Sequence, residues 1–399
     1  MPKLKILHKT VIAGAIFFLT FTNVYAFKID GFLFKGFGDT STNTILHFFY
    51  EYRPDKEWNK QELSKALVRT GERLERTGWF RNISVTHIER ENGENLVLFY
   101  LNERFPYSFW AGSIFAGVKR YNIWGKGKAI SFEIGPYQQN VRIEDAMIAF
   151  SRFSFDIRLG AEEFTYYTMP DNLYLEHNVL RRFASFNAGY RVIPDGYVNL
   201  IGAFHKIEEL TNQIKIDSYM KTGLRLKYDR IAGYPAINKG IRATLDLFYL
   251  FNVNALETTL TAEFFQQPHK KFALSQKLNA GYISEAVNEY QQFSLRNING
   301  LRTLNHIDGL IGNVCWNADI EARWKFWEPI PFLVFDMEIE AIVFFAIGEA
   351  RNNTQSLGNP NFVGGAGLRF YLQDFIIRAE VGLDNAGETT AMAWFGTSL

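Results

Sequence analysis

Residues 333–347 read LVFDMEIEAIVFFAI, a stretch with the period of two that is typical of a β-strand. One face of such a strand is apolar throughout: Leu333, Phe335, Met337, Ile339, Ala341, Val343, Phe345 and Ile347. Asp336, Glu338 and Glu340 lie on the other face, because successive side chains point to opposite sides. Three acids on a lipid-facing surface would be unfavourable, so the stretch predicts a membrane strand with its acids toward a lumen.

The preceding apolar stretch gives the same result. Val314, Trp316, Ala318, Ile320, Ala322 and Trp324 face one way, and Asn313, Asn317, Asp319, Glu321, Arg323 and Lys325 face the other. A soluble sandwich would also show one polar face, but it would need a second sheet to close its core. The aromatic content favours the membrane version.

Period-two alternation continues from about Pro106 to Leu399, so we expect a transmembrane antiparallel β-barrel over residues 105–399. Fifteen strands are visible: 107–117, 127–138, 141–152, 154–166, 182–193, 196–206, 217–229, 238–250, 255–266, 272–284, 313–325, 333–347, 361–372, 374–384 and 389–398. Single-chain bacterial barrels have even strand numbers. We therefore expect about sixteen strands, with the missing one between Tyr166 and Arg182, while fourteen and twelve stay open.

Composition excludes several classes of protein. The 399 residues include 37 Phe and 19 Tyr, which suits the aromatic girdles of a barrel in a lipid bilayer. No apolar stretch after position 30 is long enough for a transmembrane helix. A net charge of +1 and the lack of a basic tract argue against nucleic acid as a partner.

The first 26 residues read as a signal peptide. Three lysines precede an apolar core, Val11–Phe21, and Val24-Tyr25-Ala26 is a small-x-small cleavage site. A retained membrane anchor is the alternative. The one cysteine, Cys315, excludes an internal disulfide and is expected to be a small lumen residue rather than a nucleophile.

Residues 27–104 mix helix and strand signals and predict a small α+β domain. A strand opens at Phe27–Ile29, and a helix follows over Thr40–Tyr52 with Thr40 or Ser41 as its cap. Asn59 caps a second helix that has leucines and an alanine on one face. Two strands, 82–90 and 96–102, close the domain around an Asn92-Gly93 hairpin turn.

This order of elements resembles a single POTRA domain, the periplasmic module that precedes the barrel in the BamA/TamA (surface antigen D15-like) superfamily; an unrelated α+β domain is the alternative. Four barrel segments are similar to superfamily motifs in order and spacing. They are Tyr121 to Gly127 (first loop), Asp229-Arg230 with Pro235 and Gly240 (a turn between strands), Phe293 to Arg302 (the long loop), and Asn317-x-x-x-Glu321-x-Arg323 (a wall strand).

The resemblance implies that Arg302, in Gly300-Leu301-Arg302-Thr303, holds the long loop inside the lumen. The wall acid that binds this arginine in the superfamily is missing, because its motif matches Phe344-Phe345-Ala346-Ile347-Gly348. The candidate partners are Glu340, Glu338, Glu321 and Asp319, which point inward. The alternative is that these acids only make the lumen polar and do not bind Arg302.

Barrel closure should join a first strand near Phe109–Val118 to the last strand, 389–398. Gly112, Gly117 and Gly396 lie there and weaken strand pairing. A parted seam would expose backbone donors and acceptors to an incoming strand.

The resemblance therefore implies a barrel in the bacterial outer membrane, with its N-terminal domain in the periplasm, that inserts or translocates polypeptides. Its partners would be unfolded outer-membrane or secreted polypeptides and the lipid bilayer, with accessory lipoproteins left open. A passive or plugged pore without protein clients is the second hypothesis. The seven histidines show no catalytic or metal-ligand spacing, so we expect neither an enzyme nor a cofactor or metal.

Overall fold

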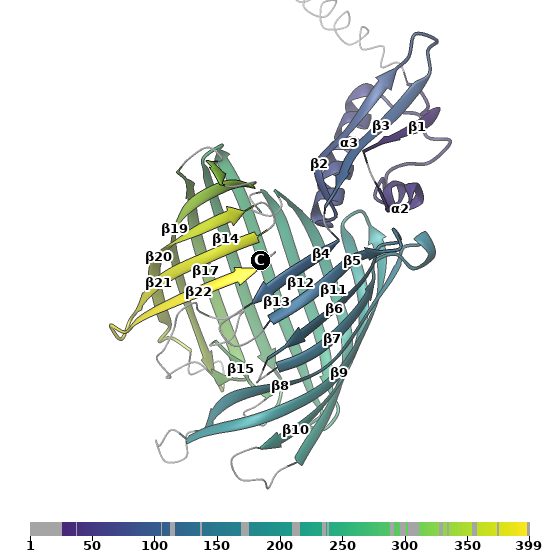
Figure 1. Cartoon of the computed structure of the whole chain (residues 1–399). Helices are drawn as coiled ribbons and strands as arrows, with labels where there is room; N and C mark the ends of the chain where they lie inside the picture. Colours follow the sequence, from purple (N-terminus) through teal and green to yellow (C-terminus); the bar gives the residue numbers. More distant parts are fainter. Residues whose placement is uncertain are drawn as a thin grey trace, which may run out of the picture.

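The computed structural model describes residues 26–396, except 37, 105, 112–115, 136–137, 169–174, 210–215, 234–236, 238, 288–290, 296–300, 302–310, 327–329, 333–334, 353–356 and 373–374. A small α+β domain sits at one end of a β-barrel, with the last strand of the barrel ending on the same side (Figure 1). We call this end of the barrel the domain end and the opposite one the far end.

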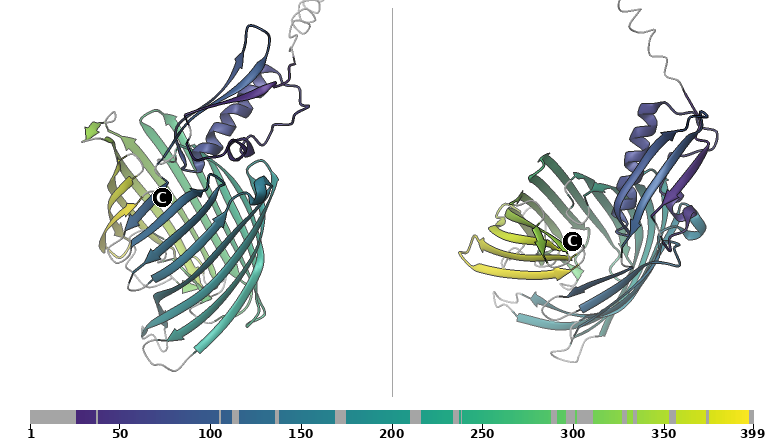
Figure 2. Two further views of the ribbon diagram at one scale, coloured as in Figure 1. Left: turned by 45° about the vertical axis from the view of Figure 1, so that its right-hand side comes forward. Right: turned by 45° about the horizontal axis from the view of Figure 1, so that its top comes forward.

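The N-terminal domain is built on a three-stranded sheet. β1 (Gly31–Lys35) runs parallel to the central β3 (Asn95–Glu103), and β2 (Phe80–Glu89) runs antiparallel to it. Helices α2 (Thr42–His47) and α3 (Lys60–Arg76) complete the domain, and α3 lies along one face of the sheet (Figure 2).

Both helices begin where the sequence places a capping side chain. The Ser41 hydroxyl accepts a hydrogen bond from the Thr44 amide at 3.2 Å, and the Asn59 side chain accepts one from the Glu62 amide at 2.7 Å. The apolar face of α3 is buried in a core that also contains Phe80 from β2, the central-strand residue Phe99, and Trp58.

Two predictions for this domain were wrong in detail. The first strand is Gly31–Lys35 and not Phe27–Ile29, because Phe27 pairs only through an isolated bridge with Trp58. Helix α2 ends at His47 and not at Tyr52, because the chain turns there and places Tyr52 edge-on against Phe32 at 4.9 Å.

The barrel is a closed antiparallel sheet. Its strands are β4 (Tyr107–Ala111), β5 (Ala116–Ile123), β6 (Lys128–Ile134), β7 (Gln138–Asp145), β8 (Phe153–Thr168), β9 (Leu175–Ile193), β10 (Gly196–Glu209), β11 (Ile216–Ala232), β12 (Lys239–Leu250), β13 (Ala255–His269), β14 (Phe272–Ile283), β17 (Val314–Lys325), β19 (Phe335–Arg351), β20 (Asn361–Leu372), β21 (Phe375–Asp384) and β22 (Thr389–Gly396). The short β18 (Ile330–Phe332) pairs with β19 beside β17. The described residues thus form sixteen wall strands, which confirms that count.

The sixteenth strand does not lie where the sequence placed it. The predicted strand 107–117 is two strands, β4 and β5, because an apolar run hides the connection between Ala111 and Ala116. The stretch from Tyr166 to Arg182 adds no strand and instead lengthens β8 and β9, which pair up to Thr168 and Leu175.

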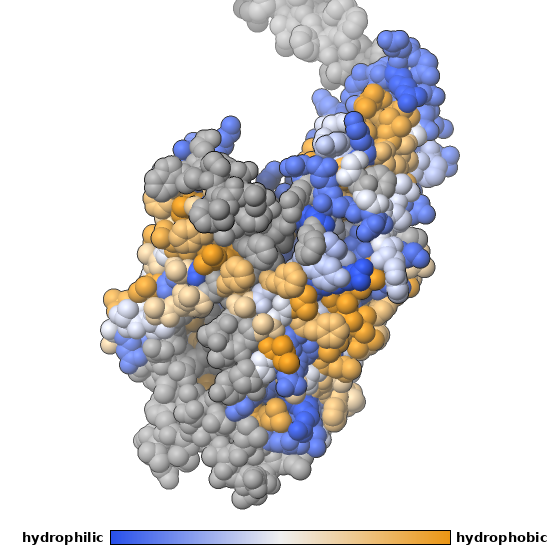
Figure 3. Space-filling view, viewed as in Figure 1, coloured by the Kyte–Doolittle hydropathy of each residue, from blue (hydrophilic) through white to orange (hydrophobic). Residues whose placement is uncertain are grey.

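Alternation of exposure along the strands separates a lipid face from a lumen face. On β19, Val343 and Phe345 are exposed on the outside, whereas Phe344 and Ala346 are buried inside. On β17, Ile320 and Trp324 point outward while Glu321 is buried. Apolar side chains gather across the middle of the wall on the face seen in the space-filling view (Figure 3).

Three short elements lie outside the wall. The 3-10 turn η1 (Ile148–Phe150) connects β7 and β8, and β15 (Phe293–Ser294) pairs with β16 (Ile311–Gly312) within the long far-end loop. In the described part of the chain, no helix has the length and apolar character needed to cross a membrane.

Candidate functional site

The barrel closes between β4 and β22 through very few residues. Among the described residues the two strands share one register pair, Ala111 with Phe395. On its other side β22 pairs with β21 continuously, from Ile376 opposite Gly396 to Leu383 opposite Thr389. We call the β4–β22 junction the seam, and among the described residues it has the fewest register pairs of any two neighbouring wall strands.

The three seam glycines have different places in the structure. Gly396 ends β22, opposite Ile376, and Gly112 lies outside the described residues. Gly117 belongs to β5, so its assignment to the first strand was wrong; the first strand ends at Ala111.

Gly117 instead makes room for an aromatic side chain. The Trp110 indole lies across it, and a Cβ at Gly117 would stand only 2.2–2.6 Å from ring atoms. The indole Nε1 donates to Glu133 on β6 at 2.7 Å, and Asn140 on β7 donates to the same carboxylate at 2.8 Å. A lumen-side row of contacts thus joins β4, β6 and β7 just beside the seam.

The N-terminal domain is fixed to the domain-end turns by a buried cluster of charges. Arg73 on α3 donates to both carboxylate oxygens of Asp195, in the β9–β10 turn, at 3.1 and 3.2 Å. The same guanidinium forms two 2.7 Å bonds with Glu51, and Arg76 donates to Asp195 at 2.5 Å.

The charge states in this cluster are fixed by its contacts. Burial alone would raise the pKa of the Asp195 carboxyl, but hydrogen bonds and charges from Arg73 and Arg76 outweigh it and hold that pKa below its usual value. Burial likewise opposes the charge on Arg73, yet Glu51 and Asp195 raise the pKa of its guanidinium above the usual value. Both groups are ionised over the whole physiological range.

The turn motif Asp229-Arg230…Pro235…Gly240 lies next to this cluster. Asp229 is 3.7 Å from Arg76 and 2.9 Å from Lys227, while Arg230 is exposed and Pro235 lies outside the described residues. Gly240 has a φ of +116°, and a Cβ there would stand 2.0 Å from the Arg230 carbonyl oxygen.

The Tyr121–Gly127 motif also turns out to be a contact with the domain. It forms the β5–β6 turn, where the Gly125 carbonyl accepts from the Ser41 amide at 3.1 Å and from the Thr44 hydroxyl at 2.6 Å. Asn122 donates to the Thr40 hydroxyl at 2.6 Å. Two of the four segments that resemble the superfamily therefore meet the N-terminal domain.

The acids proposed to hold Arg302 are engaged by the wall. Arg369 donates to Glu321 at 2.5 Å, the Tyr371 hydroxyl donates to Glu340 at 2.8 Å, and Lys325 lies 2.6 Å from Glu338. Asp319 is buried on the same inner face of β17. Arg302 itself lies outside the described residues, so its position stays a prediction.

Apolar contacts hold the described part of the long loop in the lumen. Leu295 and Leu301 are each 3% exposed and belong to a buried cluster with Phe344 and Ala346 on β19 and Val363 on β20. Ala346 stands where the superfamily motif has its acid. The loop is therefore anchored by leucines at the place where the resemblance implied a charge pair.

A second loop reaches the lumen from the domain end. The Arg323 guanidinium on β17 donates to the carbonyl of Ile237, which lies in the β11–β12 connection. Three strands separate β11 from β17 in the wall, so Ile237 lies well away from the strand that precedes it, against the inner face of β17.

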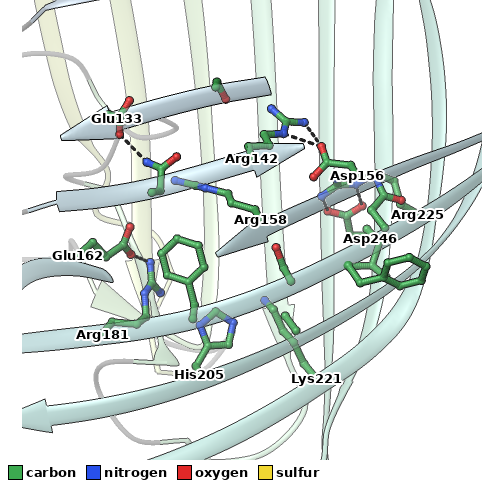
Figure 4. Close-up of a pocket in the computed structure, with 18 of the residues that line it drawn as sticks. Glu133, Arg142, Asp156, Arg158, Glu162, Arg181, His205, Lys221, Arg225 and Asp246 are labelled. Atoms are coloured by element: carbon green, nitrogen blue, oxygen red, sulfur yellow. Dashed lines mark hydrogen bonds and ion pairs between the residues drawn. The ribbon is translucent and has the colours of Figure 1, made fainter. Parts of the chain in front are cut away.

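The opposite half of the lumen holds a polar cavity of about 760 Å³ (Figure 4). Its lining side chains come from β4 to β13 and include charges of both signs, most of them in ion pairs such as Arg225 with Asp246 at 2.6 Å. In the described residues no group of His, Cys, Asp and Glu is arranged to bind a metal.

Sequence reasoning missed Arg73, Asp195, Trp110 and the two loop leucines. Asp195 had a local signal, because Pro194-Asp195-Gly196 is a turn sequence between two strands. Leu301 also had a local sequence signal, because it is an apolar residue within a polar loop. Arg73 had none, since its partner is 122 residues away.

These features define a sixteen-stranded barrel that carries a docked α+β domain, a loop inside its lumen and a weak seam. No protein-family model and no curated protein matches the sequence. Solved structures do match, over 92–93% of this chain: BamA from Haemophilus ducreyi lacking POTRA domains 1–3 (TM-score 0.53, 14% identity, 83% of that chain), CdiB from Acinetobacter baumannii (0.56, 12%, 73%) and CdiB from Escherichia coli (0.60, 12%, 75%).

The chain therefore has the barrel fold of BamA and CdiB, the fold that the sequence motifs indicated. At this identity the likeness establishes the fold alone.

Proposed function

We propose that the chain is a bacterial outer-membrane barrel that inserts polypeptides into this membrane or translocates them across it. The seam is the observation that carries the proposal. A barrel normally has no free strand edge, because hydrocarbon leaves unpaired backbone groups unsatisfied. With one register pair between β4 and β22, separating them breaks few bonds.

An opened seam would offer the edge of β22 as a template. An incoming segment could add to that edge through main-chain hydrogen bonds, which give affinity without requiring a specific sequence. Clients would accordingly be unfolded outer-membrane or secreted polypeptides, and the lipid bilayer is the medium into which the seam opens.

The N-terminal domain would act as the periplasmic receiving module, in the manner of a POTRA domain. Its sheet has two edge strands, β1 and β2, to which an extended chain could be added. The contact of Ser41 with Gly125, in the β5–β6 turn, holds this domain beside the first barrel strands, so a captured segment would be delivered close to the seam. Accessory lipoproteins are further partners implied by the resemblance.

The alternative is a plugged structural barrel without protein clients. It is favoured by the buried leucines of the long loop, which close part of the lumen. Both hypotheses include a loop inside the lumen. An experiment on the seam is therefore needed to distinguish them.

The test is a reversible crosslink at the one described seam pair. Ala111→Cys and Phe395→Cys are introduced in a Cys315→Ser background, which removes the native thiol. Directly opposed residues of an antiparallel pair have Cβ atoms about 4.5–5.5 Å apart, close to disulfide reach. The oxidised protein should fold but fail to replace the depleted wild-type protein, and reduction should restore it, as judged by outer-membrane proteomics.

The matched control crosslinks β22 to its other neighbour through Ala379→Cys and Ala393→Cys, which face each other in register. This disulfide leaves the seam free and should not impair function. Full activity of the crosslinked seam, with no change in the outer-membrane proteome on depletion, would favour the plugged barrel.

A further inference from the structure

One cation that lines the lumen cavity forms no ion pair with any residue that the structure describes. The other cations that line it form ion pairs: Arg142 with Asp156 (2.5 Å between Nε and Oδ2), Arg225 with Asp246 (2.6 Å), Lys221 with Glu257 (3.2 Å), Arg181 with Glu162, and Lys119 with Glu144. Arg158 makes no ion pair with any described residue, and its guanidinium lies 4.9 Å from the centre of the Phe183 ring.

The position of Arg158 makes this unusual. In the register of β7 and β8 it stands directly opposite Arg142, a second cation on the same lumen face. Like charges directly opposite each other destabilise a strand pair. An anion bound between the strands would remove that cost. In Figure 4 the Arg142 guanidinium is turned to Asp156, whereas the Arg158 guanidinium extends away from it into the cavity.

A second side chain of the cavity also lacks a partner. His205 on β10 is buried, and within the described structure neither ring nitrogen has a hydrogen-bond partner. Its ring stacks on Tyr219 at 4.5 Å and tilts toward Phe183 at 6.3 Å. A neutral imidazole carries one N–H donor, and leaving it unmatched in a buried place is unfavourable.

We infer that Arg158 and His205, on either side of Phe183, form a binding site for a carboxylate in the lumen. The guanidinium can bind both oxygens of a carboxylate, and the imidazole N–H can donate to a neighbouring acceptor. The Phe183 ring would cover the apolar atoms next to the carboxylate. A phosphate dianion fits less well, because its second charge would share the cavity with Asp156 and Glu133.

The ligand that fits is an acidic side chain of a polypeptide. The choice of a polypeptide as the source of this carboxylate rests on the proposed function. A free small carboxylate has the same chemistry and is the other possible source. Binding is measured on purified protein and does not depend on client handling, so this inference and the seam mechanism fail separately.

The experiment uses the full chain in lipid nanodiscs and isothermal titration calorimetry. The probes are an N-acetylated, C-amidated tetraglutamate peptide, its tetraglutamine counterpart, and acetate. The glutamate peptide should bind and the glutamine peptide should not. Arg158→Gln should weaken binding at least tenfold, because it removes a charge-assisted bond. Acetate matching the glutamate peptide in affinity would support the site and assign it to small carboxylates.

His205→Phe keeps the stacking on Tyr219 but removes the unmatched nitrogens. It should weaken peptide binding while leaving the melting temperature of the free protein unchanged or higher, which a purely structural histidine would not do. The matched control, Arg182→Gln, removes a cation from β9 whose partner, Glu208, is not part of the cavity lining. The inference fails if the glutamate peptide does not bind, or if Arg182→Gln weakens binding as much as Arg158→Gln.

Discussion

Asp195 in the β9–β10 turn accepts two hydrogen bonds from Arg73, and this pair joins the barrel to a domain that precedes it by more than a hundred residues. Both side chains are almost fully buried. A buried ion pair is weak support for stability by itself, but removing one partner leaves an uncompensated charge.

Asp195→Ala should therefore undock the N-terminal domain. We expect a loss of about 1.5–3 kcal/mol at this contact, because Arg73 keeps its two bonds to Glu51 but loses its charge-assisted bonds to Asp195. Limited proteolysis between the domain and β4 measures it, with faster cleavage expected. Glu208→Gln, which changes a half-buried far-end acid, serves as the control and should leave cleavage unchanged. Equal cleavage of both variants would contradict the role of the pair.

Docking should depend on pH through the same carboxylate. The pKa of Asp195 is lower in the folded protein than its usual value of 3.8, so the charged form contributes stability that is fully present above about pH 4. That stability is lost as the pH falls through the lowered pKa. Fluorescence transfer between labels on α3 and the barrel should stay constant from pH 7 to 5 and drop in stronger acid. The Asp195→Asn variant should lack this acid-dependent drop.

The long loop should depend on Leu301 for its position in the lumen. Leu301→Ala removes a side chain buried against Phe344, at a cost of about 2–5 kcal/mol, and should raise single-channel conductance as the loop loosens. Arg302→Ala tests the charged anchor that the resemblance implies, which is worth roughly 1.5–3 kcal/mol. A large effect of Arg302→Ala with none of Leu301→Ala would show that charge holds the loop.

Gly117 should tolerate no side chain. In Gly117→Ala the new Cβ overlaps the Trp110 ring, which must leave Glu133, and overpacking of this kind costs about 1–3 kcal/mol. Tryptophan fluorescence and heat-modifiable gel mobility would report the shift. Gly202→Ala on β10 is the matched change, because no atom lies within 4 Å of its Cβ position. Similar stability of the two variants would argue against the Trp110 contact.

The sequence predicted the parts of the fold that depend on local periodicity. Alternation on 333–347 and 313–325 identified which faces meet lipid, and the caps Ser41 and Asn59 marked helix starts correctly. The β4–β5 hairpin was lost because apolar residues continue through its connection.

Contacts between distant segments could not be predicted in this way. The pairing of Arg73 with Asp195, and of Leu301 with the wall, depends on which turns and loops fold back onto which surface. Period-two patterning carries no information on that choice. It placed Glu321 and Glu340 on the lumen face correctly but could not show that Arg369 and Tyr371 already bond to them.

The domain contacts three turns on one side of the barrel: Gly125 between β5 and β6, Asp195 between β9 and β10, and Gly233 between β11 and β12. These contacts brace the arc from β5 to β12, so we expect this arc to move together with the domain. Among the described residues, the hydrogen bonds of the domain reach only this arc and none reaches β17 to β22. If the seam opens, we therefore expect the C-terminal strands, β17 to β22, to move, while the domain and the strands that it contacts keep their positions.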